Sequence, residues 1–234
     1  MIDKPVMIIT GTRKGIGNYL AEYYTHKGFY IIGCSRDDIN FELDNYQHYC
    51  LDISDEPSVK KMFAEIRKKY GRLDILINNA GIASMNHVLL TPLKEVQDIL
   101  NTNFVGTFLC CREAVKLMKR NKSGRIVNIS SIHVPLATVG TSIYGASKAS
   151  VEQFSRVLAR EVFQFGININ LLALSVVKSS GMAEGLSDDI TLKILERTIS
   201  KTQLDFKDVS NAIDFLISPK SSMVTNQTLY LGGV

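Results

Sequence analysis

Short apolar runs separated by amphipathic stretches repeat along the whole chain, and this alternation restricts the fold more than any other feature of the sequence. The runs are five to eight residues long and nearly continuous in apolar residues. Such runs are expected of strands that are covered on both faces of a parallel sheet. Strands are predicted at 6–10, 30–34, 48–52, 73–78, 125–130, 167–174 and 227–233.

The stretches between these strands have apolar residues at helical spacing. Helices are predicted at 15–27, 56–70, about 92–120, 145–165, 188–200 and 208–217. Because strand and helix alternate, we predict an α/β fold with one Rossmann-type, doubly wound parallel sheet of about seven strands and helices on both faces. No repeat or linker divides the chain, so residues 1–234 are expected to form one domain, with a lid segment at about 175–203.

The composition argues against several kinds of partner. The net charge is only +4, and no apolar run approaches the roughly 20 residues that cross a bilayer. We therefore expect no nucleic acid and no membrane as partner, and a cytoplasmic location. Cysteines without a CxxC pattern are expected to be reduced thiols rather than zinc ligands, so no metal site is predicted. They are Cys34, Cys50, Cys110 and Cys111.

A glycine-rich turn, ITGTRKGIGNYL (9–20), follows the first predicted strand and opens the first helix. Gly11 would allow the tight turn, Gly15 would let the backbone approach a pyrophosphate, and Gly17 would let helix and strand pack closely. The free amides of a helix N-terminus favour phosphate. A dinucleotide is therefore the predicted ligand, although a glycine turn alone is also compatible with a plain tight turn.

Tyr144 and Lys148 stand four residues apart in YGASK (144–148). On a helix this spacing places both side chains on one face, about one turn apart. A free phenol has a pKa of about 10, and a nearby cation favours phenolate and lowers that pKa. The pair therefore predicts a tyrosine tuned for proton transfer. A solvated Tyr–Lys pair on a helix surface is the alternative.

Five motifs occur in an order that resembles the short-chain dehydrogenase/reductases over essentially the whole chain. They are TGTRKGIG (10–17), NNAG (78–81), NTNFVGTF (101–108), IVNISS (126–131) and YGASK (144–148). Within that family the chain most resembles the 3-oxoacyl-acyl-carrier-protein reductases. The resemblance implies one NAD(P)-binding catalytic domain that reduces a ketone to an alcohol by hydride transfer.

The resemblance also implies residue roles. Tyr144 would be the general acid, and Lys148 would hold the nicotinamide ribose and lower the pKa of Tyr144. Ser131 would hydrogen-bond the substrate carbonyl, and Asn103 would hold its helix open for a water. The other cofactor contacts implied by the family pattern are Gly11, Thr12, Arg13, Lys14, Gly15, Ile16, Gly17, Asp52, Ile53, Asn79, Ala80, Gly81, Val177 and Ser179.

The end of the second predicted strand indicates which nicotinamide cofactor is used. An acidic residue there would select NAD(H), but this chain has Ser35 and Arg36. With Lys14 they resemble the family's NADP pattern of cations and a hydroxyl around a 2′-phosphate. NADP(H) is therefore predicted, with NAD(H) as the alternative. Asp37 and Asp38 would partly offset the positive field.

Some features depart from the family pattern or stay open. Leu174 and Ser175 replace the usual Pro-Gly, which leaves the geometry of that turn undetermined. His133, two residues past Ser131, could border the substrate pocket. The basic stretch 116–125 could face an acidic carrier protein, whereas Phe163 and Phe165 do not extend a basic patch.

The substrate is accordingly predicted as a small carbonyl or alcohol compound, possibly bound to a carrier protein. A 3-oxoacyl thioester or similar β-keto compound is the main prediction. A sugar, polyol or other secondary-alcohol dehydrogenase is the alternative within the family. A non-catalytic dinucleotide sensor or an assembly subunit is the alternative outside it. A homo-oligomer, dimer or tetramer, is expected through the helices at about 101–120 and 145–165.

Overall fold

In the computed structural model, which describes residues 4–181 and 187–234, parallel strands form a single sheet. The strand order is β3-β2-β1-β4-β5-β6-β7, and every neighbouring pair is parallel in this described part. The predicted doubly wound α/β fold is thus confirmed. The strands are β1 (Val6–Thr10), β2 (Tyr30–Ser35), β3 (Tyr46–Cys50), β4 (Ile75–Asn78), β5 (Gly124–Ser131), β6 (Ile167–Leu174) and β7 (Thr228–Tyr230).

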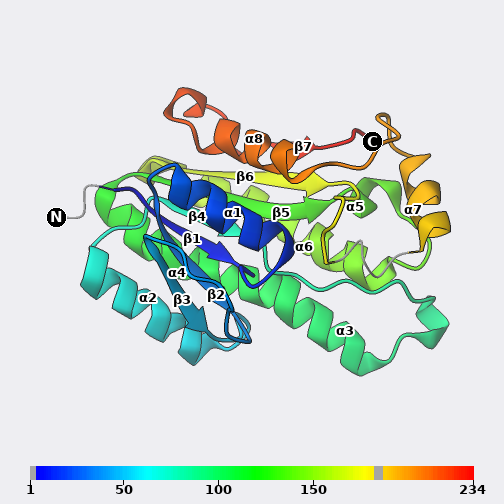
Figure 1. Ribbon diagram of the computed structural model, residues 1–234, viewed down its shortest axis with the longest axis horizontal. Coiled ribbons are helices and arrows are strands. Elements are labelled where there is room, and N and C mark those ends of the chain that lie inside the picture. Colours follow the sequence, from blue (N-terminus) through cyan, green and yellow to red (C-terminus); the bar gives the residue numbers. More distant parts are fainter. Residues whose placement is uncertain (1–3, 182–186) are drawn as a thin grey trace.

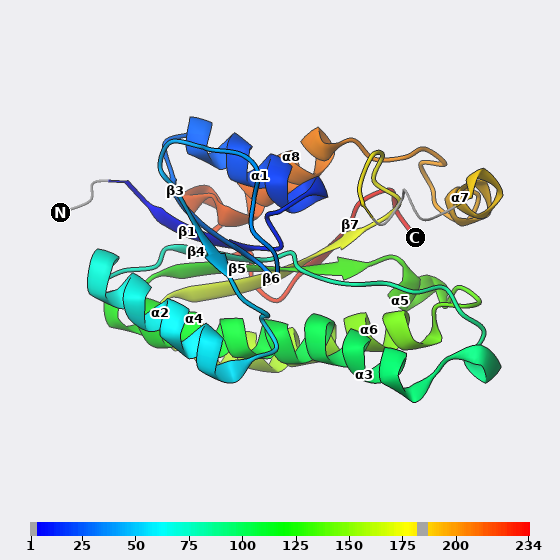
Figure 2. The ribbon, with the colours of Figure 1, turned by 60° about the horizontal axis from the view of Figure 1, so that its bottom comes forward.

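Helices cover both faces of the sheet (Figures 1 and 2), with α1 and α8 on one face and α2, α4 and α6 on the other. Each face has its own apolar core, since β1 directs Met7 and Ile9 to one side and Val6 and Ile8 to the other. The helices are α1 (Gly15–His26), α2 (Glu56–Tyr70), α3 (Leu93–Leu100), α4 (Gly106–Asn121), α5 (His133–Leu136), α6 (Ser142–Val162), α7 (Asp188–Leu195) and α8 (Phe206–Ile217).

Two predicted elements differ from the structure in ways that have physical causes. The third strand was predicted at 48–52 but is Tyr46–Cys50, because an edge strand is only partly covered and its apolar pattern is weak. The predicted helix at about 92–120 is α3 and α4 joined by a π-helical turn at Asn101–Val105. The apolar periodicity of 92–120 is that of one continuous helix, so it does not reveal the widened turn at Asn101–Val105.

The reversal of strand order beside β1 determines where a ligand can bind. The chain moves outward from β1 to β2 and β3, then crosses back so that β4 lies on the other side of β1. In open α/β sheets, ligands bind at the carboxyl ends of the strands next to such a reversal. The glycine turn follows β1, the NNAG motif follows β4, and Ser131 ends β5, so all three lie at this edge. Figure 1 shows α5 and α7 at the same edge.

The glycine between α6 and β6 offers a test of this packing. Gly166 has φ +71°, and a Cβ placed on it would lie 2.2 Å from the carbonyl oxygen of Lys122. Gly71 has a similar φ of +67°, but a Cβ there would meet nothing within 4 Å. Gly71→Ala should therefore cost about 1–2 kcal/mol of unfolding free energy, from left-handed strain alone. Gly166→Ala should cost clearly more. Urea denaturation compares them, and equal losses would contradict the clash.

Candidate active site

The residues predicted to be catalytic meet between β5 and α6. Ser131 is the last residue of β5, and Tyr144 and Lys148 lie in the first two turns of α6. All three are buried, with exposed fractions of 4%, 8% and 3%. The Ser131 hydroxyl lies close enough to the Tyr144 phenol to lower its pKa. The Nζ atom of Lys148 lies 6.0 Å from the centroid of the Tyr144 ring. The structure thus brings Ser131 of β5 close to Tyr144 and Lys148 of α6.

Lys148 is a buried amine with one backbone contact. Its Nζ donates a hydrogen bond to the carbonyl oxygen of Ile129 at 2.8 Å. Burial lowers the pKa of Lys148 to about 8, because the ammonium form loses its hydration. An ammonium has three hydrogens, so this contact leaves donors for a ligand's hydroxyl groups.

The net direction of the tyrosine's pKa shift is opposite to the lowering expected from the sequence. Burial raises the pKa of Tyr144 above the ordinary value of a phenol, and the nearby Ser131 hydroxyl only partly offsets this. The physical reason is that desolvation penalises phenolate, and the same desolvation penalises the charge on Lys148. Tyr144 is therefore held in its protonated form, which is the form that a proton donor needs.

Asn103 lies in the π-helical turn between α3 and α4 and is fully buried. Its side chain pairs with both backbone groups of Ile82, accepting from the amide at 2.8 Å and donating to the carbonyl at 2.9 Å. It also donates to the Ser147 hydroxyl at 2.9 Å, which in turn donates to the carbonyl of Tyr144 at 2.7 Å. A π-turn at a functional site is a common feature, and here it ties Asn103 to the helix that carries Tyr144.

His133 is the neighbour of the tyrosine. The rings of His133 and Tyr144 meet edge to face with centroids 6.0 Å apart. The Nδ1 atom of His133 is 2.9 Å from the Thr138 hydroxyl. Burial, and then the charge of Arg197, lower the pKa of His133. His133 thus lies beside the predicted proton donor, and that it borders the substrate pocket stays a prediction.

The glycine turn after β1 has the shape that a phosphate-binding turn requires. Gly11 has φ +76°, and a Cβ on it would lie 2.9 Å from the Cα of Ala80. A Cβ on Gly17 would lie 2.2 Å from the carbonyl oxygen of Gly11. At Gly15, with φ +61°, a Cβ would make an ordinary van der Waals contact, 3.4 Å from the amide nitrogen of Gly181. The first turn of α1 has no acidic residue to repel a phosphate. The turn therefore fits a dinucleotide.

Asn79 and Ala80 hold the turn against the sheet. The backbone amides of both donate to the Thr10 hydroxyl, at 3.0 and 2.9 Å. The Asn79 side chain donates to the carbonyl oxygens of Thr10 and Gly11 at 2.9 and 3.4 Å. Its amide group thus binds the protein backbone rather than being free for a ligand.

Two other predicted cofactor residues are engaged within the protein. The carboxylate of Asp52 accepts from the amide and hydroxyl of Ser54 at 2.8 and 2.7 Å. The side chain of Ile53 is buried in the core, where a Cβ on Gly106 would lie 2.6 Å from it. Only the backbone of Ile53 is therefore left for a ligand. Ile16 packs against the core on the α1 side.

Of the cations predicted to select NADP(H), Arg36 directly follows β2, whereas Lys14 lies beside Gly181. Arg36 is exposed next to the half-buried Ser35. Arg13 forms an ion pair with Asp37 at 3.4 Å, which explains how the positive field tolerates that aspartate. The carboxylate of Asp38 accepts from the Ile39 amide at 2.9 Å and so caps its own turn. This region is rich in hydrogen bonds and open to solvent.

The segment after β6 lies over the glycine turn. Val177 is buried and pairs with Leu204. Ser179 takes a left-handed φ of +56°, and a Cβ on Gly181 would be 3.3 Å from the Nζ of Lys14. The hydroxyl of Ser175, which is buried at the replaced Pro-Gly position, has no hydrogen-bond partner within the described residues. Part of the predicted lid, 182–186, lies outside those residues.

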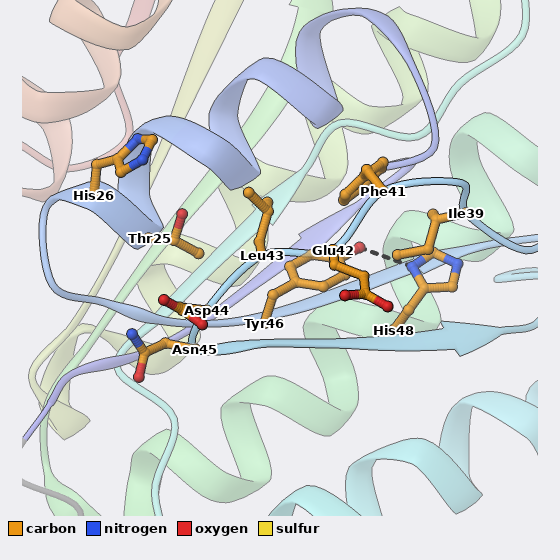
Figure 3. Close-up of a pocket in the computed structure, with 10 residues that line it drawn as sticks. All are labelled: Thr25, His26, Ile39, Phe41, Glu42, Leu43, Asp44, Asn45, Tyr46 and His48. Carbon is orange, nitrogen blue, oxygen red and sulfur yellow. Dashed lines mark hydrogen bonds between the residues drawn. The ribbon is translucent and has the colours of Figure 1, made fainter.

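One cluster of possible metal ligands and two cavities were not predicted from the sequence. The ligand atoms of Asp38, His48 and Cys50 lie within 4.8 Å of one another, although no metal ligands were predicted near a cysteine. A cavity of about 870 Å³ beside β3 (Figure 3) contains none of the predicted catalytic residues. It is lined by Thr25, His26, Ile39, Phe41, Glu42, Leu43, Asp44, Asn45, Tyr46 and His48. A cavity of about 330 Å³ lies beside α3, between 82–84 and 92–99.

No helix in the described part of the chain combines the length and apolar character needed to span a bilayer.

Comparison with known proteins agrees with this geometry. The family model for short chain dehydrogenase matches residues 5–191. The 3-oxoacyl-[acyl-carrier-protein] reductase FabG of Escherichia coli is 30% identical over 97% of this chain and 96% of its own length. FabG of Vibrio cholerae is 28% identical over 99% and 97%. The structure of ElxO with NADP bound has a TM-score of 0.88 and 30% identity, covering 97% and 96%. A Leptospira borgpetersenii short chain dehydrogenase with bound NAD+, at 23% identity and TM-score 0.90 over 98% and 92%, shares the fold.

The lowered pKa of Lys148 predicts a pH-dependent stability. The group has a pKa of about 8 in the folded protein and about 10.4 in an unfolded chain. Between these values the unfolded state binds more protons, so stability rises with pH. Below pH 8, Lys148 is protonated in both states, and the desolvation of its ammonium group lowers the unfolding free energy by the full amount. Relative to Lys148→Met, the wild-type chain should gain roughly 3 kcal/mol of unfolding free energy from pH 8 to 10.5.

Urea denaturation at several pH values measures this difference. Lys61→Met, on the exposed face of α2, is the reference for removing a surface lysine. A difference between wild type and Lys148→Met that stays constant across this range would show that Lys148 is not desolvated.

Proposed function

Because the chain belongs to the short-chain dehydrogenase family, we propose that it reduces the keto group of a 3-oxoacyl thioester or similar β-keto compound to an alcohol. The family resemblance inferred from five sequence motifs is confirmed. The chain is an oxidoreductase, and NADP(H) is its cofactor. The identity of the substrate and the roles of individual residues are the parts that we propose.

The observation that carries the proposal is that the Ser131 and Tyr144 hydroxyls are buried close together, with the Lys148 amine beside the tyrosine ring. Two hydroxyls brought together at the carboxyl edge of the sheet can both donate to one carbonyl oxygen. A sensor that only binds dinucleotides does not need such a pair. The geometry therefore favours an enzyme over a non-catalytic subunit.

When bound, NADPH supplies a hydride to the carbonyl carbon. The hydroxyl of Ser131 would donate to the carbonyl oxygen and orient it. Tyr144, protonated because burial raises its pKa, would give its proton to that oxygen as negative charge develops. Lys148 would hold its charge near the ring and stabilise the phenolate that remains. Asn103 would keep α6 in place through Ser147.

The cofactor would be held by the glycine turn and the end of β2. The amides that follow Gly11 and Gly15 would receive the pyrophosphate at the N-terminus of α1. Ser35, Arg36 and Lys14 would surround the adenosine 2′-phosphate, and the Arg36 side chain is exposed. The remaining Lys148 donors would hold the nicotinamide ribose.

The substrate class rests on the FabG relatives, whose printed name is 3-oxoacyl-[acyl-carrier-protein] reductase. The basic stretch 116–125, however, is not beside the site. It reaches the first residues of β5, whereas Ser131 ends that strand seven residues after Gly124, about 23 Å away. That stretch therefore does not place a carrier protein at the mouth. The second candidate for the substrate is therefore a compound that is not bound to a carrier protein: a free β-keto compound, a ketone or a secondary alcohol.

A homo-oligomer and a cytoplasmic location belong to the same proposal. Phe108 of α4 and Phe154 of α6 pack edge to face on the outer side of these helices, 5.8 Å between centroids. Phe108 and Val157 remain 36% and 48% exposed, which suits coverage by a second copy. All four cysteines are free thiols, as expected in a reducing compartment.

A substrate screen with the tyrosine variant tests the reaction. Wild-type protein should oxidise NADPH with acetoacetyl thioesters faster than with simple ketones or sugars. Tyr144→Phe keeps the ring but removes the transferable proton, so kcat should fall by about 10²–10⁴-fold while NADPH still binds. Near-normal turnover in Tyr144→Phe would refute the role of Tyr144. A higher kcat/KM for a sugar or simple ketone would refute the substrate class.

Arg36→Ala tests how the 2′-phosphate is read. Losing one charge-assisted hydrogen bond should weaken NADPH binding by about 1–3 kcal/mol and leave NADH binding nearly unchanged. Fluorescence titration measures both dissociation constants. Arg67→Ala, an exposed arginine near the far end of α2, controls for a general loss of positive charge. Equal weakening of both cofactors by Arg36→Ala would show that Arg36 does not contact the phosphate.

A further inference from the structure

A chain of side-chain hydrogen bonds connects the glycine turn to Ser35, and the proposed reaction does not account for it. The hydroxyls of Thr12 and Tyr46 are 2.7 Å apart. The Tyr46 hydroxyl is 2.7 Å from Nδ1 of His48, and Nε2 of His48 is 2.9 Å from the Ser35 hydroxyl. Figure 3 shows Tyr46 and His48 side by side on β3, joined by this bond. We refer to Thr12, Tyr46, His48 and Ser35 as the relay.

The direction of each bond in the relay follows from the partners. Ser35 has one hydroxyl hydrogen and donates it to the carbonyl oxygen of Asp37 at 2.7 Å. It must therefore accept from Nε2 of His48, which also lies 3.4 Å from that same carbonyl. A neutral ring with hydrogen on Nε2 accepts at Nδ1, so Tyr46 donates to it. Thr12 in turn donates to Tyr46. Every donor points toward Ser35.

A glycine in β2 makes room for the relay. A Cβ on Gly33 would lie 2.0 Å from the Tyr46 hydroxyl and 2.4 Å from that of Thr12. The φ of Gly33 is not positive, so its backbone does not require glycine. Glycine inside a strand often marks a close approach of other groups. Here the approaching groups are the first two members of the relay.

We propose that His48 is a positioning residue for NADPH selectivity, which fixes the Ser35 oxygen and leaves the Ser35 hydrogen free to turn from Asp37 to the adenosine 2′-phosphate. The inference rests on the proposed use of NADPH. His48 holds the oxygen through a bond that Ser35 accepts. That bond survives when the hydroxyl hydrogen rotates, so the oxygen does not have to move.

The chemistry of the two cofactors explains why this arrangement would discriminate between them. An ionised phosphate oxygen only accepts hydrogen bonds, so Ser35 must donate to it. A donor that itself accepts from a chain of donors is polarised and donates more strongly. The 2′-hydroxyl of NADH both donates and accepts, and tolerates either orientation of Ser35. Burial lowers the pKa of His48, which favours the neutral ring that the relay needs.

The same imidazole belongs to the cluster with Asp38 and Cys50, whose ligand atoms lie within 4.8 Å of one another. Both ring nitrogens of His48 are already hydrogen-bonded in the relay. A metal at Nε2 would have to displace Ser35. Metal binding is therefore the competing explanation, and Cys50 distinguishes the two because it belongs to the cluster and not to the relay.

A double-mutant cycle tests the proposal, with dissociation constants for NADPH and NADH measured by fluorescence titration without substrate. His48→Leu should raise the NADPH constant by about 3- to 10-fold, the effect of one hydrogen bond, and change the NADH constant by less than about twofold. In a Ser35→Ala background, His48→Leu should have no further effect, because it acts only through Ser35. His48→Gln, whose amide can replace the Nε2 donor, should restore most of the affinity.

The outcomes separate the explanations. Cys50→Ser should leave NADPH affinity unchanged. An increase of NADPH affinity by zinc that EDTA reverses and Cys50→Ser abolishes would assign His48 to a metal site and overturn the proposal. Equal loss for both cofactors, or additivity with Ser35→Ala, would also overturn it. If wild type binds NADPH and NADH equally, the NADPH assignment fails and the selectivity role fails with it. If wild type prefers NADPH and His48→Leu keeps that preference, the inference alone fails.

Discussion

The parallel alignment of the strands is the constraint on which the candidate site depends. Because neighbouring strands run in one direction, their carboxyl ends lie at one edge of the sheet. The turn after β1, the motif after β4 and the last residue of β5 therefore meet there, although they are separated by up to 120 positions (from Gly11 to Ser131). The reversal of strand order beside β1 opens the edge to a ligand. No single motif creates this site.

Strand position then gives the two ends of the site different chemistry. β5 lies between β4 and β6, and both of its faces are covered, so Ser131, Tyr144 and Lys148 are buried. Desolvation dominates there, which holds Tyr144 protonated and lowers the pKa of Lys148. β3 is an edge strand and its residues stay partly exposed. At that end, charges and hydroxyls remain hydrated and recognition depends on hydrogen bonds rather than burial.

The two ends are also stabilised differently. At the buried end, Asn103 and Ser147 satisfy backbone groups of Ile82 and Tyr144 and fix the helix. A buried polar network of this kind specifies a single geometry because an unpaired member would be costly. At the edge, Tyr46 reaches across β2 to Thr12 of the glycine turn through the space that Gly33 leaves, and His48 bonds to Tyr46. The sheet thus links the phosphate-binding turn to both neighbouring strands.

The sequence by itself determined the fold class, the family and the identity of Ser131, Tyr144, Lys148 and Asn103 as the candidate residues. Apolar runs, glycine spacing and the four-residue interval between Tyr144 and Lys148 are patterns among residues close in the chain. Such patterns can be recognised without the structure. Tertiary structure decided what depends on burial and on partners distant in the chain. It set the upward shift of the Tyr144 pKa, because desolvation outweighs the lowering effect of the Ser131 hydroxyl. It also brought His48 of β3 to Ser35 of the neighbouring strand β2, a contact that no sequence interval encodes.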